Sequence, residues 1–170
     1  MIWKRLIYII TGNALNQKFN IEYQQGGYYK ITAKHTGKSL TAKDGLIKEN
    51  TEIVQSDYQG LDSQKWMLRD SKINGWIISS YINPELSITI NGNIENGTNL
   101  VLSKTVNSDK QMIYTCIVNQ EEKTKENGIY KIAIGKNPNQ VLQVSEEGIE
   151  ENKQIDIHGY RKFIKSKILL

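Results

Sequence analysis

The sequence predicts an all-β fold built from one unit that occurs three times. Three observations support this prediction: a sequence pattern recurs along the chain, each recurrence reads as short strands separated by turn residues, and no stretch has the period of an amphipathic helix. A chain of 170 residues has the size of one ordinary domain. Its hydrophobic fraction of 38% suits strands that bury only one face.

The repeat is clearest where the copies align without a gap. Residues 74–118 align with residues 27–70, and their second halves match at a spacing of 47 residues, so that Thr51 falls on Thr98. A third copy begins at residue 127, where Gly-Ile-Tyr-Lys-Ile matches the Gly-Tyr-Tyr-Lys-Ile of the first copy. We therefore expect three copies, at 27–70, 74–118 and 127–170.

Each copy is expected to form four short strands. The second and third strands are separated by turn pairs such as Asp44-Gly45 and Asn91-Gly92, which accept the positive φ angles of tight hairpins. Pro84 and Pro138 both precede a second strand, where proline disturbs a sheet least. The expected strands are 29–33, 39–42, 52–55 and 65–68 in copy one, 76–80, 87–90, 99–102 and 112–116 in copy two, and 130–134, 141–144, 154–157 and 163–167 in copy three.

These units are expected to close on themselves. A solenoid of three such units would lack polar caps, whereas a closed barrel removes the exposed strand edges. We therefore predict a β-trefoil of three four-stranded repeats with pseudo-threefold symmetry.

Residues 1–24 contain part of an additional copy. A shift of 47 positions places Gln17 on Gln64 and Phe19 on Trp66. Two interpretations are open: the segment is the tail of a preceding trefoil in a longer protein, or it closes the barrel by completing the third copy, in competition with residues 163–169. The first is slightly preferred, which places the trefoil domain at 25–170 and implies that a chain beginning near Gln25 folds as stably as the whole.

Composition excludes several classes of function. The net charge of +4 comes from 22 basic and 18 acidic residues spread along the chain, so no nucleic-acid partner is expected. The single cysteine, Cys116, allows no disulfide within the chain. No apolar run is long enough to span a membrane, and the run at 6–10 is too short for the core of a signal peptide.

Catalytic chemistry is not expected either. The two histidines, His35 and His158, lie in different copies, and no serine or cysteine stands in a nucleophile motif. Metal ligands at a recognisable spacing are absent from the sequence. We therefore predict a protein that is not an enzyme and needs no metal or cofactor.

One motif has a known counterpart. Gln64-Lys65-Trp66 resembles the Gln-x-Trp repeat of ricin-B-type lectin modules, and Gln17-Lys18-Phe19, Gln111-Met112-Ile113 and Arg161-Lys162-Phe163 read as its variants. The aromatic residue of the motif is expected in the barrel core, so Trp66 is interpreted as a core residue. The resemblance implies a carbohydrate-binding module of a larger secreted or cell-surface protein, such as a toxin, a haemagglutinin or a glycosidase. The lysine-, asparagine- and isoleucine-rich composition is similar to that of clostridial proteins.

The resemblance also implies one sugar site per copy, and this chain departs from the family pattern at each. The family has an aspartate after the second-strand leucine and an aromatic residue near the end of the third strand, which together hold and stack a sugar ring. The aspartate position here holds Thr41, Thr89 and Gln143, and the aromatic position holds Ser56, Ser103 and His158.

Partial sites are therefore expected in two copies. The candidates in copy one are Thr41, Asp57, Tyr58, Asp62 and Gln64, with Tyr58 either stacking on a sugar or packing under its own loop. The candidates in copy three are Gln143, Asp156, His158 and Tyr160, with His158 either a ligand-binding or a solvated loop residue. Copy two offers Asn107, Asp109 and Gln111 without an aromatic residue, so it is not expected to bind sugar.

Two functions remain open at this point. The Gln-x-Trp framework favours a lectin-like module whose partners are glycans or polysaccharides. The missing aspartates favour a protein-binding or purely structural trefoil that has lost sugar binding, with a separate protein or other domains of a parent chain as its partner.

Overall fold

The computed structural model describes residues 15–71, 76–106, 108–117, 128–134, 140–145 and 148–159. Each strand expected in this part of the chain lies within two residues of an observed one. The fourth strand expected in copy three, at 163–167, lies outside the described residues. The elements are η1 (Leu15–Gln17), β1 (Phe19–Gln24), β2 (Tyr28–Ala33), β3 (Ser39–Ala42), η2 (Lys43–Gly45), β4 (Ile53–Ser56), η3 (Asp62–Gln64), β5 (Trp66–Asp70), β6 (Trp76–Ser80), β7 (Leu86–Ile90), β8 (Leu100–Lys104), β9 (Met112–Ile117), β10 (Gly128–Ile134), β11 (Gln140–Val144) and β12 (Ile155–Gly159).

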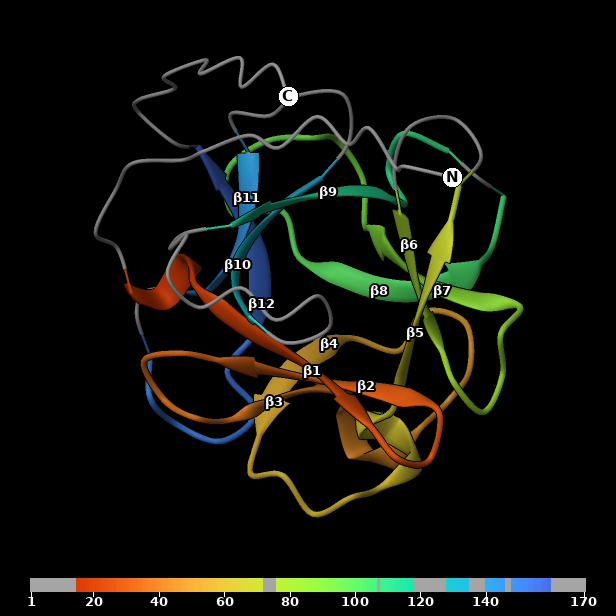
Figure 1. Ribbon diagram of the computed structural model, residues 1–170. Coiled ribbons are helices and arrows are strands. Elements are labelled where there is room, and N and C mark those ends of the chain that lie inside the picture. The colour runs from red at the N-terminus through yellow and green to blue at the C-terminus, as the bar shows by residue number, and fades with distance from the viewer. Residues whose placement is uncertain are drawn as a thin grey trace, which may run out of the picture.

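Antiparallel pairing closes the barrel (Figure 1). The strands pair in the order β1–β2–β5–β6–β9–β10, and β10 returns to β1. The remaining strands form one hairpin per copy: β3–β4, β7–β8 and β11–β12. This arrangement confirms the predicted all-β fold, a β-trefoil.

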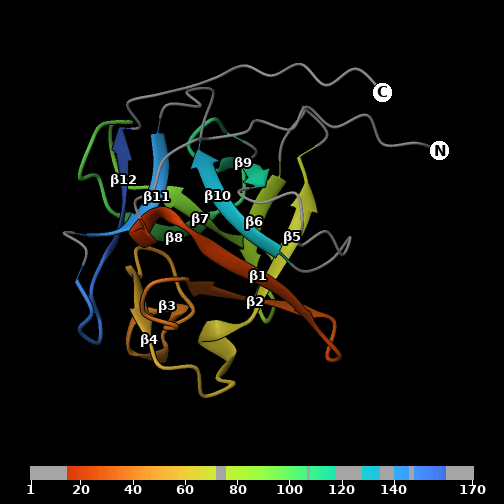
Figure 2. The ribbon, with the colours of Figure 1, turned by 60° about the vertical axis from the view of Figure 1, so that its left-hand side comes forward.

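The strand that completes the barrel comes from the N-terminal segment. Phe19 of β1 is paired with Tyr130 of β10 on one side and Ala33 of β2 on the other, and Figure 2 shows β1 running alongside β2. Phe19 and Ile21 are both buried in the core. Residues 19–24 are thus part of the barrel in the described structure, whereas residues 163–169, which could compete for this place, lie outside the described residues. A chain beginning near Gln25 would lose a barrel strand.

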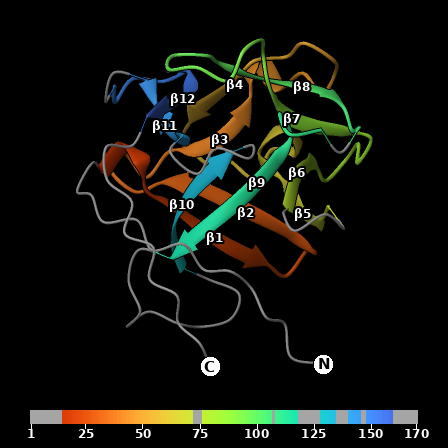
Figure 3. The same cartoon turned by 90° about the horizontal axis from the view of Figure 1, so that it is seen from above.

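The three hairpins gather at one side of the barrel, where backbone hydrogen bonds join them in a ring (Figure 3). The donors, Asn50, Gly97 and Asn152, occupy the same place in each copy and have positive φ angles of 66°, 82° and 58°. Glycine and asparagine adopt this left-handed conformation at the lowest cost. Each donor reaches the next hairpin: Asn50 N to Leu102 O at 2.8 Å, Gly97 N to Ile157 O at 2.8 Å, and Asn152 N to Gln55 O at 2.9 Å.

The aromatic residues of the Gln-x-Trp motif anchor the core. Trp66 and Phe19 are each only 1% exposed, and they are the two largest fully buried side chains in the described part of the chain. The indole Nε1 of Trp66 donates a hydrogen bond to Leu40 O at 2.9 Å, which satisfies its polar atom within the core. The interpretation of Trp66 as a core residue is confirmed.

Candidate functional site

In copy one, three predicted polar positions form a closed network. The hydroxyls of Thr41 on β3 and Ser56 on β4 lie 2.8 Å apart. Gln64 Nε2 donates to Ser56 Oγ at 3.0 Å, to Thr41 Oγ1 at 3.3 Å and to Asp57 O at 2.8 Å, while its Oε1 accepts from the Gln59 amide at 2.8 Å. Gln64 is 0% exposed. Its amide is therefore used to hold the loop before β5 and offers no free group to a ligand.

Copy two repeats the same network. Thr89 Oγ1 lies 2.7 Å from Ser103 Oγ, and Gln111 Nε2 donates to Thr89 Oγ1 at 2.9 Å and to Lys104 O at 2.6 Å. The amide of Val106 donates to Gln111 Oε1 at 2.8 Å. At the two positions where the resemblance implies sugar-binding residues, copy two thus has hydroxyls that bond to each other. Asn107 lies outside the described residues.

Copy three differs because it takes its glutamine from the N-terminal segment. Gln17, at the end of η1, donates from Nε2 to Gln143 Oε1 at 3.3 Å. In the β11–β12 hairpin, Gln143 is paired with Asp156 and Val141 with His158, so His158 stands where Ser56 stands in copy one. Gln143 and Asp156 are buried, at 7% and 6% exposed, whereas His158 is exposed.

The structure brings together Gln143 and Asp156, as pairing partners, with Gln17 and with His158 at the aromatic position. Tyr160 lies outside the described residues. Gln17 was not among the sequence candidates for copy three. The shift of 47 residues that places it on Gln64 was the available sign.

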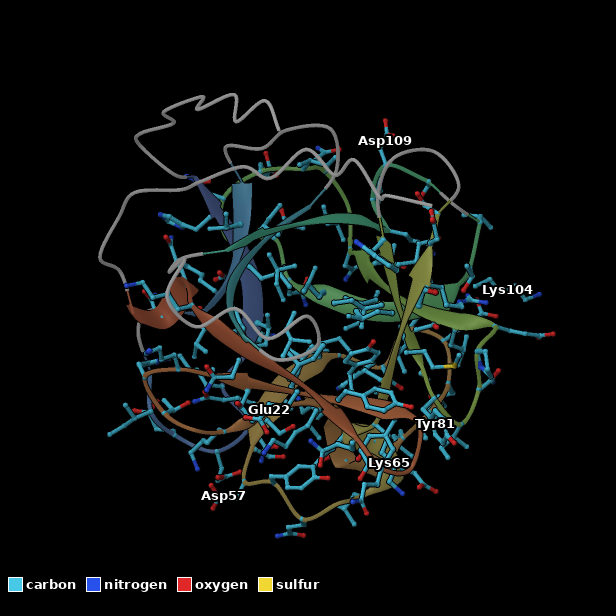
Figure 4. All side chains as sticks on the ribbon, viewed as in Figure 1. Glu22, Asp57, Lys65, Tyr81, Lys104 and Asp109 are labelled. Atoms are coloured by element: carbon cyan, nitrogen blue, oxygen red, sulfur yellow. The ribbon has the colours of Figure 1, made fainter. Side chains whose placement is uncertain are left out.

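Asp57 belongs to an ion cluster that links copy one to copy three. Lys38 Nζ contacts Asp57 Oδ1 at 2.8 Å and also the carboxylate of Glu151. Both carboxylate oxygens of Glu151 accept from the Asp57 amide at 3.2 Å. The hydrogen bond from Lys38, and then its charge, lower the pKa of the Asp57 carboxyl, and the two carboxylates raise the pKa of Lys38. Figure 4 shows Asp57 at the edge of the molecule, where its carboxylate faces solvent.

Tyr58 and Asp62 face a different group of residues. The Tyr58 hydroxyl lies 3.1 Å from that of Tyr28, and Lys30 Nζ lies 5.1 Å from the centre of the Tyr58 ring. Asp62 pairs with Lys65 at 2.8 Å. The hydrogen bond with Tyr28, followed by desolvation, raises the pKa of Tyr58 to about 12. Tyr58 is therefore directed toward β2, and its stacking on a sugar in the copy-one slot stays a prediction.

The described part of the chain contains no group of three or more His, Cys, Asp or Glu side chains placed to hold a metal ion. Within these same residues, no helix has the length and apolar character to cross a membrane.

Three hairpins, each contacted by a motif glutamine, around a core that contains the motif aromatics Trp66 and Phe19 define a lectin-type β-trefoil. A family described as ricin-type beta-trefoil lectin domain-like matches residues 15–103, more than half of the sequence. The chain belongs to this family.

Solved structures agree on the fold. A designed threefold-symmetric protein, ThreeFoil, is similar with a TM-score of 0.68 and 19% identity, over 79% of this chain and 90% of that protein. A ricin B-like lectin of Macrolepiota procera, solved with lactose, has a TM-score of 0.58 and 16% identity, over 89% and 92%. The C-half of an earthworm R-type lectin, solved with GalNAc, has a TM-score of 0.54 and 17% identity, over 87% and 96%. Comparison with curated proteins finds no relative that matches the chain.

Proposed function

We propose that this chain is a carbohydrate-binding module and that its family-type sugar site lies in copy three. The observation that carries the proposal is the contrast between the three lobes. In copies one and two the aromatic position holds a serine that bonds to the neighbouring threonine, whereas in copy three it holds the exposed His158. The His158 ring can contact a ligand, because copy three has no serine–threonine hydroxyl pair between the two strands of its hairpin.

The chemistry of the copy-three residues suits a sugar. An imidazole offers a planar surface for the apolar face of a pyranose and ring nitrogens for its hydroxyls. Gln143 replaces the family aspartate with a neutral amide, which hydrogen-bonds sugar hydroxyls more weakly than a carboxylate does. Gln17 Nε2 donates a hydrogen bond to the oxygen of that amide and so fixes its position. The ligands named with two similar structures, lactose and GalNAc, make galactose-type sugars the first to test.

The proposal includes the setting of the module. A single weak site gains useful avidity when it is linked to other sites, so we infer that the chain is a non-catalytic module of a larger secreted or cell-surface protein. A protein-binding or structural trefoil is the second candidate, and the closed hydroxyl networks of copies one and two favour it.

A titration followed by amide NMR distinguishes the two. Lactose and GalNAc are added to the purified chain, and shifts are expected around Gln143 and His158. The variant His158→Ser gives copy three the residue found in the other two copies and should abolish these shifts. Ser103→Ala, at the equivalent position of copy two, is the matched control and should leave them unchanged. Shifts that survive His158→Ser would remove the proposed site.

A further inference from the structure

Three tyrosines from distant parts of the chain, none of them at the family's aspartate or aromatic positions, lie close together. Tyr28 begins β2, Tyr58 follows β4, and Tyr81 follows β6. The Tyr28 and Tyr58 hydroxyls are 3.1 Å apart, and the centres of the Tyr28 and Tyr81 rings are 5.6 Å apart with their planes at 54°. We call these three residues the tyrosine platform. Tyr58 is 37% exposed, so its surface is open to a ligand.

The β1–β2 turn fixes the platform in place. Tyr81 donates from its hydroxyl to Gly26 O at 2.8 Å. A Cβ at Gly26 would lie 2.8 Å from Cε1 of Tyr28, so the ring of Tyr28 packs closely on the Gly26 backbone and would have to shift if a larger residue stood there. An aromatic surface held in this way loses little conformational entropy when a ligand binds.

Charged groups surround the platform in balanced pairs. Lys30 lies over the Tyr58 ring and pairs with Glu22 at 2.8 Å. Lys65 lies 5.5 Å from the centre of the Tyr28 ring and pairs with Asp62 at 2.8 Å. Figure 4 shows Lys65 beside Tyr81, with Glu22 on the neighbouring strand β1. These two lysines and two carboxylates have no net charge together, while their ammonium and carboxylate groups can still donate and accept hydrogen bonds.

Copy two does not repeat the platform. The position of Tyr58 in copy two is Thr105, whose hydroxyl accepts from Arg69 at 3.2 Å and bonds to Ser87. No aromatic side chain stands there. The equivalent position in copy three is Tyr160, which lies outside the described residues. Within the described residues, the platform is built from segments of copies one and two and the turn that follows β1.

We infer that the tyrosine platform binds a neutral oligosaccharide, as a second site separate from the copy-three slot. Sugar recognition requires a rigid aromatic face beside a few fixed polar groups, and the platform supplies both. Its balanced charge disfavours an anionic ligand such as a sialylated glycan. The inference rests on the proposed class of function, carbohydrate binding, but it does not require the site at His158.

The test is an amide NMR titration with xylotriose and N-acetylchitotriose as neutral probes and sialyllactose as the anionic comparison. Neutral probes should shift the amides of Tyr58, Lys65 and Tyr81. Tyr58→Ala should weaken this binding by about fivefold or more, as expected for the loss of one aromatic contact, while Tyr58→Phe retains the ring and most of the affinity. Tyr81→Ala removes a second aromatic ring of the platform and should also weaken binding. The amide spectrum of each variant verifies that it is folded.

Two controls separate this site from the rest of the molecule. Tyr23 is exposed and lies on the same hairpin, but it packs edge-on against Tyr29, so Tyr23→Ala should leave binding at the platform unchanged. His158→Ser should also leave it unchanged. Shifts at the platform that persist in Tyr58→Ala and Tyr81→Ala, or no neutral-sugar shift there at about 10 mM, would overturn the inference. Shifts confined to His158 and Gln143 would also overturn the inference, but they would leave the proposed function intact. Binding of sialyllactose alone would show that the ligand of the platform is not a neutral oligosaccharide.

Discussion

Gln17 Nε2 donates to Gln143 Oε1 at 3.3 Å across 126 positions of the chain. The equivalent bond of copy one, from Gln64 to Thr41, spans 23 positions. The third lobe therefore takes its bracing glutamine, and the barrel strand that follows, from the opposite end of the sequence. Changes at the buried residues of this segment, such as Gln17 and Phe19, therefore act on copy three or on barrel closure.

Phe19→Ala tests the barrel role of β1. Phe19 occupies the core position that Trp66 occupies in copy one, so its truncation should lower the free energy of unfolding by about 3–4 kcal/mol. Urea unfolding of the full chain measures this change. Tyr23→Ala, on the same strand but exposed, should cost clearly less. Equal losses for the two variants would show that β1 does not pack in the barrel.

Removal of residues 1–24 should have a larger effect. Without β1, β10 and β2 lose their shared neighbour, and the unpaired edges expose backbone groups. We expect the truncated chain to lose its cooperative melt, as followed by circular dichroism. A cooperative melt at the temperature of the full chain would contradict this expectation.

Gln64→Ala and Gln111→Ala should destabilise the protein by similar amounts. Each glutamine is fully buried and bonds to two hydroxyls and to loop backbone, so its loss leaves several polar groups without partners. A decrease of about 2–3 kcal/mol in the free energy of unfolding is expected for each. Gln59→Ala, at an exposed side chain of the same loop, is the control. A near-zero effect at Gln64 with a large effect at Gln111 would mean that the networks are not equivalent.

Sequence reasoning recovered the parts of the molecule that repeat. The spacing of 47 residues predicted the strands, and the Gln-x-Trp triplet predicted the buried position of Trp66, because core packing imposes the same pattern on each copy. It slightly preferred the interpretation in which residues 1–24 lie outside the barrel, because Phe19 and Phe163 both fit one position, whereas the structure pairs β1 with β2 and β10.

The candidate sites were harder to predict from the sequence, because they depend on contacts that do not repeat from copy to copy. Tyr58 meets Tyr28 and Lys30 through a loop whose path no local pattern sets, and Lys38 meets Glu151 across 113 positions. A single sequence carries no sign of such pairs. The closed hydroxyl networks were also hidden, because threonine and serine in a sugar-binding position look equally able to bond a ligand or each other.

Asp57→Asn should change how stability depends on pH. Lys38 holds the pKa of the folded Asp57 carboxyl below its ordinary 3.8. The ion pair therefore adds stability above the unfolded pKa, and this contribution disappears as the pH falls through the folded pKa. The melting temperatures of the native chain and of Asp57→Asn should differ near pH 6 and converge as the pH falls below the lowered pKa of Asp57. Because the pair is exposed, the difference should be small and should shrink in high salt. A difference in melting temperature that persists at low pH would show that Asp57 stabilises the fold through packing and not through its charge.

Tyr28→Phe should restore the ordinary ionisation of Tyr58. The hydrogen bond with Tyr28 is the largest cause that raises the pKa of Tyr58 from 10.0 to about 12. This bond stabilises the fold fully below pH 10, and its contribution is lost as the pH rises through 12. Carbon-labelled tyrosine NMR follows the Cζ signal of each ring, and Tyr58→Phe identifies the signal of Tyr58 by its loss. The Tyr58 signal should titrate near 12 in the native chain and closer to 10 in Tyr28→Phe. Tyr81→Phe keeps the Tyr28–Tyr58 bond and should leave the titration unchanged. An unaltered pKa in Tyr28→Phe would show that burial, and not the hydroxyl pair, sets the state of the platform.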